Sequence, residues 1–575
     1  MKSIKLSLYS LFVFFAIFTA CGKPSAEAKT NSDFYKEVSR LNRIISEISR
    51  KYVEEVDPKE LTDAAISGMR SVLDPNTSVL DQKASSDLKV ATDGEFGGIG
   101  ITIGIRDNHL TVISPLAGTP AYNLGIMAGD RIVQIDDKPT KDLTQDEAVE
   151  RLRGKVGTNV TVKIAREGVP APFDITITRA KIVVHAVHYA NMISEDIGYI
   201  QLVSFNQKTA SELEEAINKL KKQGMKKLVL DLRFNSGGLL NQAIEVSELF
   251  LKKGNKVVSA KGRIINAEHK ATKNGMVSDD MPIAVLVNQG TASAAEILSG
   301  ALQDWDRALV VGKTTFGKGS VQTVFPLSSD YEGETTLKIT TALYYLPFGR
   351  CVNKPEQGIG SKDTAVRDTQ IYHTAGGRKM YGGGGITPDV EAESKSIPWL
   401  AQVKERMALY FKFAVKYRSQ IGDLAAKIDS TWQIPDTLFN SFKAFANADT
   451  NFAKIKSPDQ IKADELEEVL VREQNIIYGD TSKVLRDTLL VAALAELRST
   501  LAKKNEAQAS EIKNYSLNAI KRELIAAAKG EEARISWMLR EDRQLEEALR
   551  YLRNDSLYKE KMKPVKRDEK TAGKR

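Results

Sequence analysis

The chain has 575 residues, of which 42% are hydrophobic and 27% charged, and a formal net charge of +8. This composition is ordinary for a soluble protein, and the length is enough for three or four domains. The charge is modest and spread out except in the basic tail from residue 559 to 575, which we interpret as a solvated end and not as a nucleic-acid interface.

The N-terminus carries a targeting signal. Its apolar run, residues 11–20, is too short to cross a bilayer, which takes about 20 residues, but it has the length found in secretory signals. The run ends at Cys21, which resembles a bacterial lipoprotein signal, although Phe18 stands where leucine is usual. We expect residues 1–20 to be removed and lipidated Cys21 to anchor the protein in the bacterial cell envelope, facing the periplasm. A plain signal peptide or a short anchor is the alternative.

Cysteine and histidine usage predicts no metal site and no disulfide. If Cys21 carries lipid, no second cysteine remains for a disulfide with Cys351. The five histidines are scattered, and no cysteine or histidine cluster has metal-ligand spacing. We expect no metal and no other cofactor.

Behind the signal, the sequence divides into parts of different pattern. Residues 21–33 are small and polar, as in a tether, and residues 34–91 place apolar side chains at helical spacing. Residues 92–181 predict short strands around one helix. Residues 182–395 alternate strands and helices, which predicts an α/β unit with a largely parallel sheet. Residues 396–575 are predicted to be a helical C-terminal region that includes the basic tail.

The stretch "EFGGIGITIGI" predicts a peptide-binding loop. Glycines before a strand let backbone N–H groups turn inward and hold an anion. With the later "AGDRIVQIDD", the unit resembles a PDZ domain, which adds a peptide C-terminus as a strand and holds its carboxylate with loop amides. The resemblance implies that the binding loop is Gly97, Gly98, Ile99, Gly100 and Ile101. Because Ile99, Ile101, Leu116 and Leu124 are apolar, we expect the last residue of the bound peptide to be apolar too. A plain glycine-rich turn is the alternative.

Lys318, between two glycines, admits two interpretations. With Gly312 and Gly317 it has the spacing of a phosphate-binding P-loop, but that motif needs Ser or Thr directly after the lysine, and Gly319 follows here. The stretch "GSVQTVFPL" also predicts a turn and a strand where a P-loop opens a helix. Nucleotide binding is therefore not expected, and Lys318 needs another role.

Ser293 lies in "VNQGTASAAEILSG", directly before a helical pattern. One interpretation is structural, because Ser293 and Glu296 fit a capping box. The other is catalytic, because N–H groups at a helix start can stabilise the oxyanion formed when a serine attacks an acyl carbon. No histidine is placed as its base. The candidate base is Lys318, since a lysine acts as a base when burial lowers its pKa from about 10.4 towards neutrality. Gln322 can orient that lysine without adding a charge.

"GTASAAE" followed by "TFGKGSVQ" resembles the C-terminal processing peptidases, or tail-specific proteases, of peptidase family S41. "LDPNTSVLD", "LVLDLRFNSGGLL" and "GGGGITPDV" extend the resemblance over about residues 35–395. It implies an α/β multidomain protein, with a crotonase-like Ser-Lys protease core and an inserted PDZ domain. Residues 353–378 form an insertion relative to many members.

The resemblance also assigns roles to residues. It implies that Ser293 is the nucleophile, Lys318 the general base and Gln322 the lysine-orienting residue. The N–H of Ala294 and that of one glycine, Gly237 or Gly238, form the oxyanion hole.

The resulting prediction is a serine endopeptidase of the Ser-Lys type that cuts proteins near their C-termini. Its substrates are polypeptides with free apolar C-termini, and no nucleic acid is expected as a partner. The alternative function is a catalytically inactive PDZ lipoprotein that acts as a scaffold or tether. An adaptor protein and an oligomer are compatible with the sequence, which identifies neither.

The anchor can be tested by replacing Cys21→Ser. We expect this variant to be released as a soluble protein or to remain an uncleaved precursor, because the lipid acceptor is gone. Fatty-acid labelling and membrane fractionation measure the outcome, with Cys351→Ser as the control that changes neither. Unchanged labelling of the Cys21→Ser protein contradicts the prediction.

Overall fold

The structure is a computed structural model that describes residues 26–327, 335–354, 370–418, 428, 431–478, 481 and 484–563. Cys21 and the signal lie outside the described residues, as do residues 355–369 of the predicted insertion and residues 564–575 of the basic tail. The chain divides into two units, with the boundary in the sequence between Val79 and Leu80, and each is described by itself.

The first unit contains two helices, α1 (Ala26–Lys51) and α2 (Pro58–Ser71). Helix α1 begins within the predicted tether, because "AEAK" consists of strong helix formers. Helix α2 is capped by Asp57, whose side chain accepts the N–H of Lys59, and it has proline at its first position.

The second unit begins with helix α3 (Gln82–Asp93) and the predicted PDZ domain. An antiparallel sheet joins its strands in the order β3-β4-β5-β7-β8, and β2 pairs with β9 apart from that sheet. In β7 every second side chain is buried, and these side chains fill the core of the domain. The elements are β2 (Glu95–Gly98), β3 (Ile101–Arg106), β4 (His109–Pro115), α4 (Pro120–Asn123), β5 (Arg131–Ile135), β6 (Lys138–Pro139), α5 (Gln145–Leu152), β7 (Asn159–Ala165), β8 (Phe173–Thr178) and β9 (Ala180–Val183).

A six-stranded sheet in the order β10-β11-β12-β15-β16-β21 forms the centre of the next part. From β11 to β21 all neighbours are parallel, and β10 pairs antiparallel with β11, which confirms the predicted largely parallel sheet. The elements are β10 (Val187–Met192), β11 (Ile197–Leu202), α6 (Thr209–Lys222), β12 (Lys227–Asp231), α7 (Leu240–Glu248), β15 (Ile283–Val287), α8 (Ala294–Asp304), β16 (Leu309–Gly312) and β21 (Val390–Glu391).

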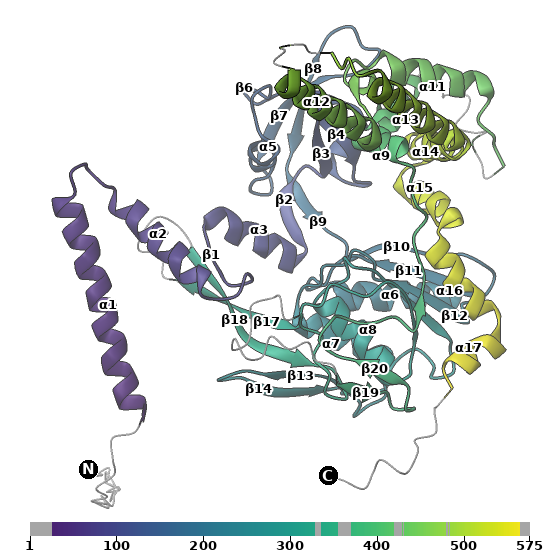
Figure 1. Cartoon of the computed structure of the whole chain (residues 1–575). Coiled ribbons are helices and arrows are strands. Elements are labelled where there is room, and N and C mark those ends of the chain that lie inside the picture. The colour runs from purple at the N-terminus through teal and green to yellow at the C-terminus, as the bar shows by residue number, and fades with distance from the viewer. Residues whose placement is uncertain are drawn as a thin grey trace, which may run out of the picture. The chain divides into compact units, whose positions relative to one another are not determined.

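Both faces of this sheet are buried. Leu228 and Leu230 of β12 pack in one core with helices α6, α7 and α8. Val229, between them, packs on the opposite face with residues of α16 (Arg543–Arg553). Figure 1 shows α16 and α17 (Asp555–Lys561) lying along the sheet. The alternation explains why the three inner residues of β12, 228–230, are all apolar.

A second, antiparallel sheet and a hairpin complete the α/β part. The sheet contains β13 (Lys256–Lys261), β14 (Asn266–Lys270), β17 (Ser320–Leu327) and β18 (Thr335–Tyr345), and the hairpin is β19 (Ile371–His373) with β20 (Lys379–Tyr381). Strand β17 begins two residues after Lys318 and no helix follows the lysine, which confirms the predicted turn and strand.

The predicted helical C-terminal region contains α9 (Trp399–Arg406), α10 (Leu409–Tyr417), α11 (Asp436–Ala448), α12 (Pro458–Tyr478), α13 (Thr488–Ala507), α14 (Ala509–Lys529) and α15 (Glu531–Met538), followed by α16 and α17. Helices α10, α11 and α14 share a core around Phe413, Phe442 and Ile520. Within the described ranges, no helix has the length and hydrophobicity needed to cross a bilayer.

Candidate active site

Ser293 lies at the start of α8 in a strained conformation. Its backbone has φ +55° and ψ −118°, whereas an ordinary N-cap residue is extended. A left-handed non-glycine residue costs about 1–3 kcal/mol and persists where the surrounding structure enforces it, often at active sites. Ser293 itself is half-buried, and every residue of α8 behind it is buried.

The loop after β12 packs directly against this serine. A Cβ atom on Gly237 would lie 2.7 Å from Ser293 Cβ and 2.9 Å from the backbone nitrogen of Ala294, so a side chain does not fit there. The N–H of Ala292 donates to the carbonyl of Asn235 at 2.9 Å, which joins the loop to the residue before the serine. The backbones of Gly237 and Ala294 therefore lie close together, beside the side chain of Ser293.

Gly237 and Gly238, the two glycines considered for the oxyanion hole, differ in the hydrogen bonds that their N–H groups make. That of Gly237 donates to Asn235 Oδ1 at 2.9 Å. Those of Gly238 and Ala294 donate to no atom in the part of the chain that the structure describes, and Gly238 is exposed. Gly238 and Ala294 thus present N–H groups that remain available to a substrate atom.

The side chain of Glu296 joins the serine segment to the lysine loop. Its Oε2 accepts the N–H of Ser293 at 2.8 Å and that of Lys318 at 2.9 Å. Its Oε1 accepts the N–H of Gly317 at 2.8 Å and the hydroxyl of Thr315 at 2.5 Å. A carboxylate has about four acceptor positions, so these four donors use its full capacity.

Tyr344 of β18 makes a second connection between the same two segments. Its hydroxyl lies 2.5 Å from the carbonyl oxygen of Lys318 and 3.2 Å from that of Ser293, and the two oxygens share its one proton. The N–H of Tyr344 also donates to the carbonyl of Gly319 at 2.8 Å. Glu296 therefore holds the N–H groups of Ser293 and Lys318, while Tyr344 holds their carbonyl groups.

Burial controls the protonation of both connecting side chains. It raises the pKa of Glu296 to about 7, although the four hydrogen bonds act in the opposite direction. Burial, and after it the nearby Glu296 carboxylate, raises the pKa of Tyr344 well above its usual value. Tyr344 therefore keeps the proton that it donates.

Two glycines leave room for the turn around Lys318. A Cβ on Gly317 would lie 2.8 Å from the side chain of Lys354, and one on Gly319 would lie 2.8 Å from Asn353. Lys318 itself is half-buried. Of the apolar surroundings expected for the lysine, Val321 packs against the core, but Phe316 is 43% exposed.

Gln322 follows on β17, directly after an irregularity in its pairing with β18. Its Nε2 donates to the hydroxyls of Ser320 at 2.8 Å and Thr340 at 3.3 Å. The amide is therefore fixed through its nitrogen, which leaves the oxygen as the acceptor.

The predicted PDZ loop is divided between two environments. Gly97 and Gly98 belong to β2 and pair with β9, so the loop itself is Ile99 and Gly100. The N–H groups of Ile99 and Gly100 donate to no acceptor among the residues described, as a carboxylate-binding loop requires.

The side chain of Ile99 is only 2% exposed and packs in the core of the domain, so it presents little apolar surface to a peptide. Of the other apolar residues considered, Ile101 is half-buried, and Leu116 and Leu124 are exposed.

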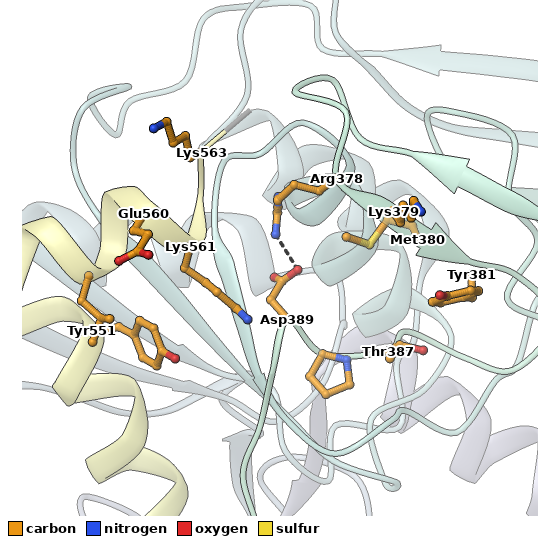
Figure 2. A pocket seen from close by; sticks show the side chains of 12 residues that line it. Arg378, Lys379, Met380, Tyr381, Thr387, Asp389, Tyr551, Glu560, Lys561 and Lys563 are labelled. Carbon is orange, nitrogen blue, oxygen red and sulfur yellow. Dashed lines mark hydrogen bonds and ion pairs between the residues drawn. The ribbon is translucent and has the colours of Figure 1, made fainter. Parts of the chain in front are cut away.

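A pocket of about 560 Å³ lies between β20 and α17 (Figure 2). Arg378 and Asp389, which form an ion pair 2.5 Å long, line it on one side, and Tyr551 and Lys561 line it on the other. Neither Ser293 nor Lys318 borders this pocket, so we assign it no part in the chemistry. Within the described ranges, no group of His, Cys, Asp or Glu is arranged to hold a metal ion.

Sequence patterns did not indicate two contributors to the site. Thr315 is buried, donates to Glu296 and accepts the N–H of Ile386 at 2.6 Å. Tyr344 is followed directly by Tyr345, and nothing in the neighbouring sequence shows which of the two is buried.

Three protein-family models match the chain. The model described as "Peptidase family S41" matches residues 196–363, and that of the PDZ domain matches residues 87–165. A third, "Activating protease CtpB N-terminal domain", matches residues 19–84.

Similar proteins carry matching names. "Carboxy-terminal-processing protease" of Bartonella bacilliformis is 43% identical over 341 residues, which are 58% of this chain and 76% of the relative. "Carboxy-terminal processing protease CtpA" of Bacillus subtilis is 38% identical over 328 residues, 57% of this chain and 69% of the relative. A solved structure, "Photosystem II D1 C-terminal processing protease", is 28% identical with a TM-score of 0.34 and covers 60% of this chain and 85% of its own.

The S41 and PDZ matches define a serine-type peptidase that carries a PDZ domain. The chain belongs to the carboxy-terminal processing proteases of peptidase family S41, which confirms the family predicted from the sequence.

The role of Glu296 can be tested with Glu296→Gln. The amide replaces an acceptor oxygen by a donor, so at least one buried N–H or hydroxyl loses its partner, at about 1–3 kcal/mol. We expect the free energy of unfolding to fall by about that amount and kcat to fall about tenfold or more. Urea unfolding and a peptide-cleavage assay measure both.

Glu248→Gln is the matched control, because Glu248 is buried and accepts the N–H of Thr272 but lies outside the site. It should lower stability without changing kcat.

Glu296 also makes the stability of the protein depend on pH, since its pKa is raised from 4.5 to about 7 in the folded protein. Its contribution to stability is complete below about pH 4.5 and is lost as the pH rises to about 7, so the difference from Glu296→Gln should shrink over that window. An unchanged kcat in Glu296→Gln contradicts the assigned role.

Proposed function

We propose that this protease is an endopeptidase of the Ser-Lys type that cuts polypeptides near their C-termini, and that its α/β part is a crotonase-like core. In this proposal Ser293 is the nucleophile and Lys318 its general base. The observation that carries it is that two buried side chains, Glu296 and Tyr344, each bind the backbones of both Ser293 and Lys318.

The chemistry follows from these roles. Neutral Lys318 takes the hydroxyl proton of Ser293 as its Oγ attacks the scissile carbonyl carbon. The tetrahedral intermediate collapses to an acyl-serine ester, and the leaving amine takes the proton from Lys318. Lys318 then removes a proton from water, which hydrolyses the ester and restores Ser293.

The N–H groups of Ala294 and Gly238 bind the oxyanion in this scheme. Both are without an acceptor in the described part of the chain, whereas the N–H of Gly237 already donates to Asn235. Such donors stabilise charge where it develops in the transition state. Gln322, fixed by Ser320 and Thr340, offers its amide oxygen to Lys318 and orients the lysine without keeping it charged.

The PDZ domain selects the substrate. The N–H groups of Ile99 and Gly100 bind a free C-terminal carboxylate, and the peptide adds as a strand beside β3. Ile101 and Leu116, which remain accessible, favour an apolar last residue. Lipidated Cys21 holds the enzyme in the cell envelope, where it faces the periplasm.

The relatives favour an active enzyme over an inactive scaffold, because they are named as proteases and the proposed dyad and oxyanion donors are all present. A scaffold would not need the shared support of Ser293 and Lys318.

The dyad is tested by Ser293→Ala, Lys318→Ala and the double variant. Each single change should lower cleavage of an unstructured polypeptide by about 10³-fold or more, with no ATP in the assay. Because the two residues act as one unit, the double variant should be hardly slower than either single one. Thermal unfolding serves as the control for folding, and a multiplicative loss in the double variant contradicts Lys318 as the base.

The tail-reading role is tested with one polypeptide in two forms, a free C-terminal carboxylate and its amide. A hydrogen-bonded charge contributes about 1.5–3 kcal/mol, so the free acid should be cut about ten- to a hundredfold faster at low concentration. A version ending in Asp should be slow as well. Equal cleavage of acid and amide contradicts C-terminus reading even if Ser293 proves essential.

A further inference from the structure

The C-terminal helix α16 lies outside the segment that the S41 model matches, yet it packs on the central sheet. Leu545, Ala548 and Leu552 form a buried stripe at helical spacing, in one core with Val229 and Leu286 of the sheet. The position of α16 on the sheet, against β15 and β16, is therefore set by close packing.

The first residues of α16 bind Arg233. Asp542 is the N-cap of α16, and its Oδ1 accepts the N–H of Leu545 at 3.0 Å. The same oxygen accepts Arg233 Nη1 at 3.0 Å, and Oδ2 accepts Nη2 at 2.5 Å, so the contact is bidentate. Gln544 Oε1 also accepts Nη1 at 3.0 Å, while its Nε2 donates to the carbonyl of Ala392.

Asp231, at the end of β12, binds the other side of the same guanidinium. Its carboxylate accepts Arg233 Nε at 3.0 Å, Nη2 at 2.6 Å and the backbone N–H of Arg233 at 2.9 Å. Tyr199 on β11 donates its hydroxyl to this carboxylate at 2.6 Å. The side chain of Arg233 is only 14% exposed, and it is enclosed between two carboxylates on different elements.

Arg233 directly precedes the loop that carries Gly238. The next residue, Phe234, has a left-handed backbone (φ +59°), and its N–H donates to Asn288 Oδ1 at 3.0 Å. Gly237 then packs on Ser293. A shift of Arg233 would thus be transmitted over five residues to the N–H of Gly238.

We infer that Asp542 is a positioning residue for the protease reaction, which acts through Arg233 on the oxyanion loop. This inference rests on the proposed role of Gly238. It gives α16 a part in transition-state stabilisation, although α16 contributes no group that touches the substrate.

The test is Asp542→Asn. Asparagine is a good N-cap and keeps one oxygen for Leu545 and Arg233 Nη1, but it removes one of the two carboxylate acceptors of Nη2, leaving only Asp231, and it removes the negative charge. We expect kcat to fall about tenfold, with KM within about twofold and the midpoint of thermal unfolding nearly unchanged. Affinity for a peptide boronate, which forms a tetrahedral adduct with the serine, should fall about as much as kcat, because both depend on the oxyanion donors.

Glu541→Gln is the matched control. Glu541 is the adjacent acidic residue, but it lies at the surface and pairs with Lys395 at 3.1 Å. It should change neither kcat nor boronate affinity. Arg233→Lys keeps the charge but loses the bidentate contact, so it should lower kcat and boronate affinity as Asp542→Asn does. The double variant should be hardly worse than either single one, because both changes break the same contact.

Unchanged kcat and boronate affinity in both Asp542→Asn and Arg233→Lys overturn the inference, as does a loss of kcat that only follows a loss of folded protein. A different result would show that the proposed function itself is wrong, namely that the wild type and Ser293→Ala cleave the substrate at the same rate.

Discussion

One buried carboxylate, that of Glu296, holds together the two loops on which the chemistry depends. Strands β15 and β16 are parallel neighbours, so the segments that follow them emerge at the same edge of the sheet. Proximity at an edge does not fix their relative position to within a few tenths of an ångström. Glu296 does so, because its two oxygens accept N–H groups from both segments at 2.8–2.9 Å. The backbone strain at Ser293 is tolerated because these contacts enforce it.

Local sequence patterns predicted the individual parts of this site but not their connection. The spacing of Ser293 and Glu296 indicated a capping box, and Glu296 does accept the N–H of Ser293. Nothing in that pattern indicates that the same carboxylate binds Gly317 and Lys318, because such a contact depends on how two loops meet in space. The choice between Tyr344 and Tyr345 has the same origin. Strand geometry places one of the two inward, and Tyr344, which pairs with Ala260 of β13, is the buried one.

The fold was predictable where periodicity is strong. Alternating strands and helices predicted the parallel sheet, and the β-branched stretch after Lys318 predicted β17. The burial of single side chains was less predictable. Ile99 was expected to supply an apolar side chain for peptide binding, and tertiary packing places that side chain in the core of its domain. The bond between Arg233 and Asp542 joins residues 309 positions apart, beyond the reach of any local pattern.

The two-sided burial of β12 also makes the central sheet depend on a distant part of the sequence. The face that carries Val229 and Leu286 is covered by α16, which follows β12 by about three hundred residues. Removal of α16 would expose this apolar face to water and would leave Arg233 with Asp231 but without Asp542 as a partner. A stop codon or a proteolytic cut before Asp542 would therefore weaken the packing of the sheet and the support of Arg233 together.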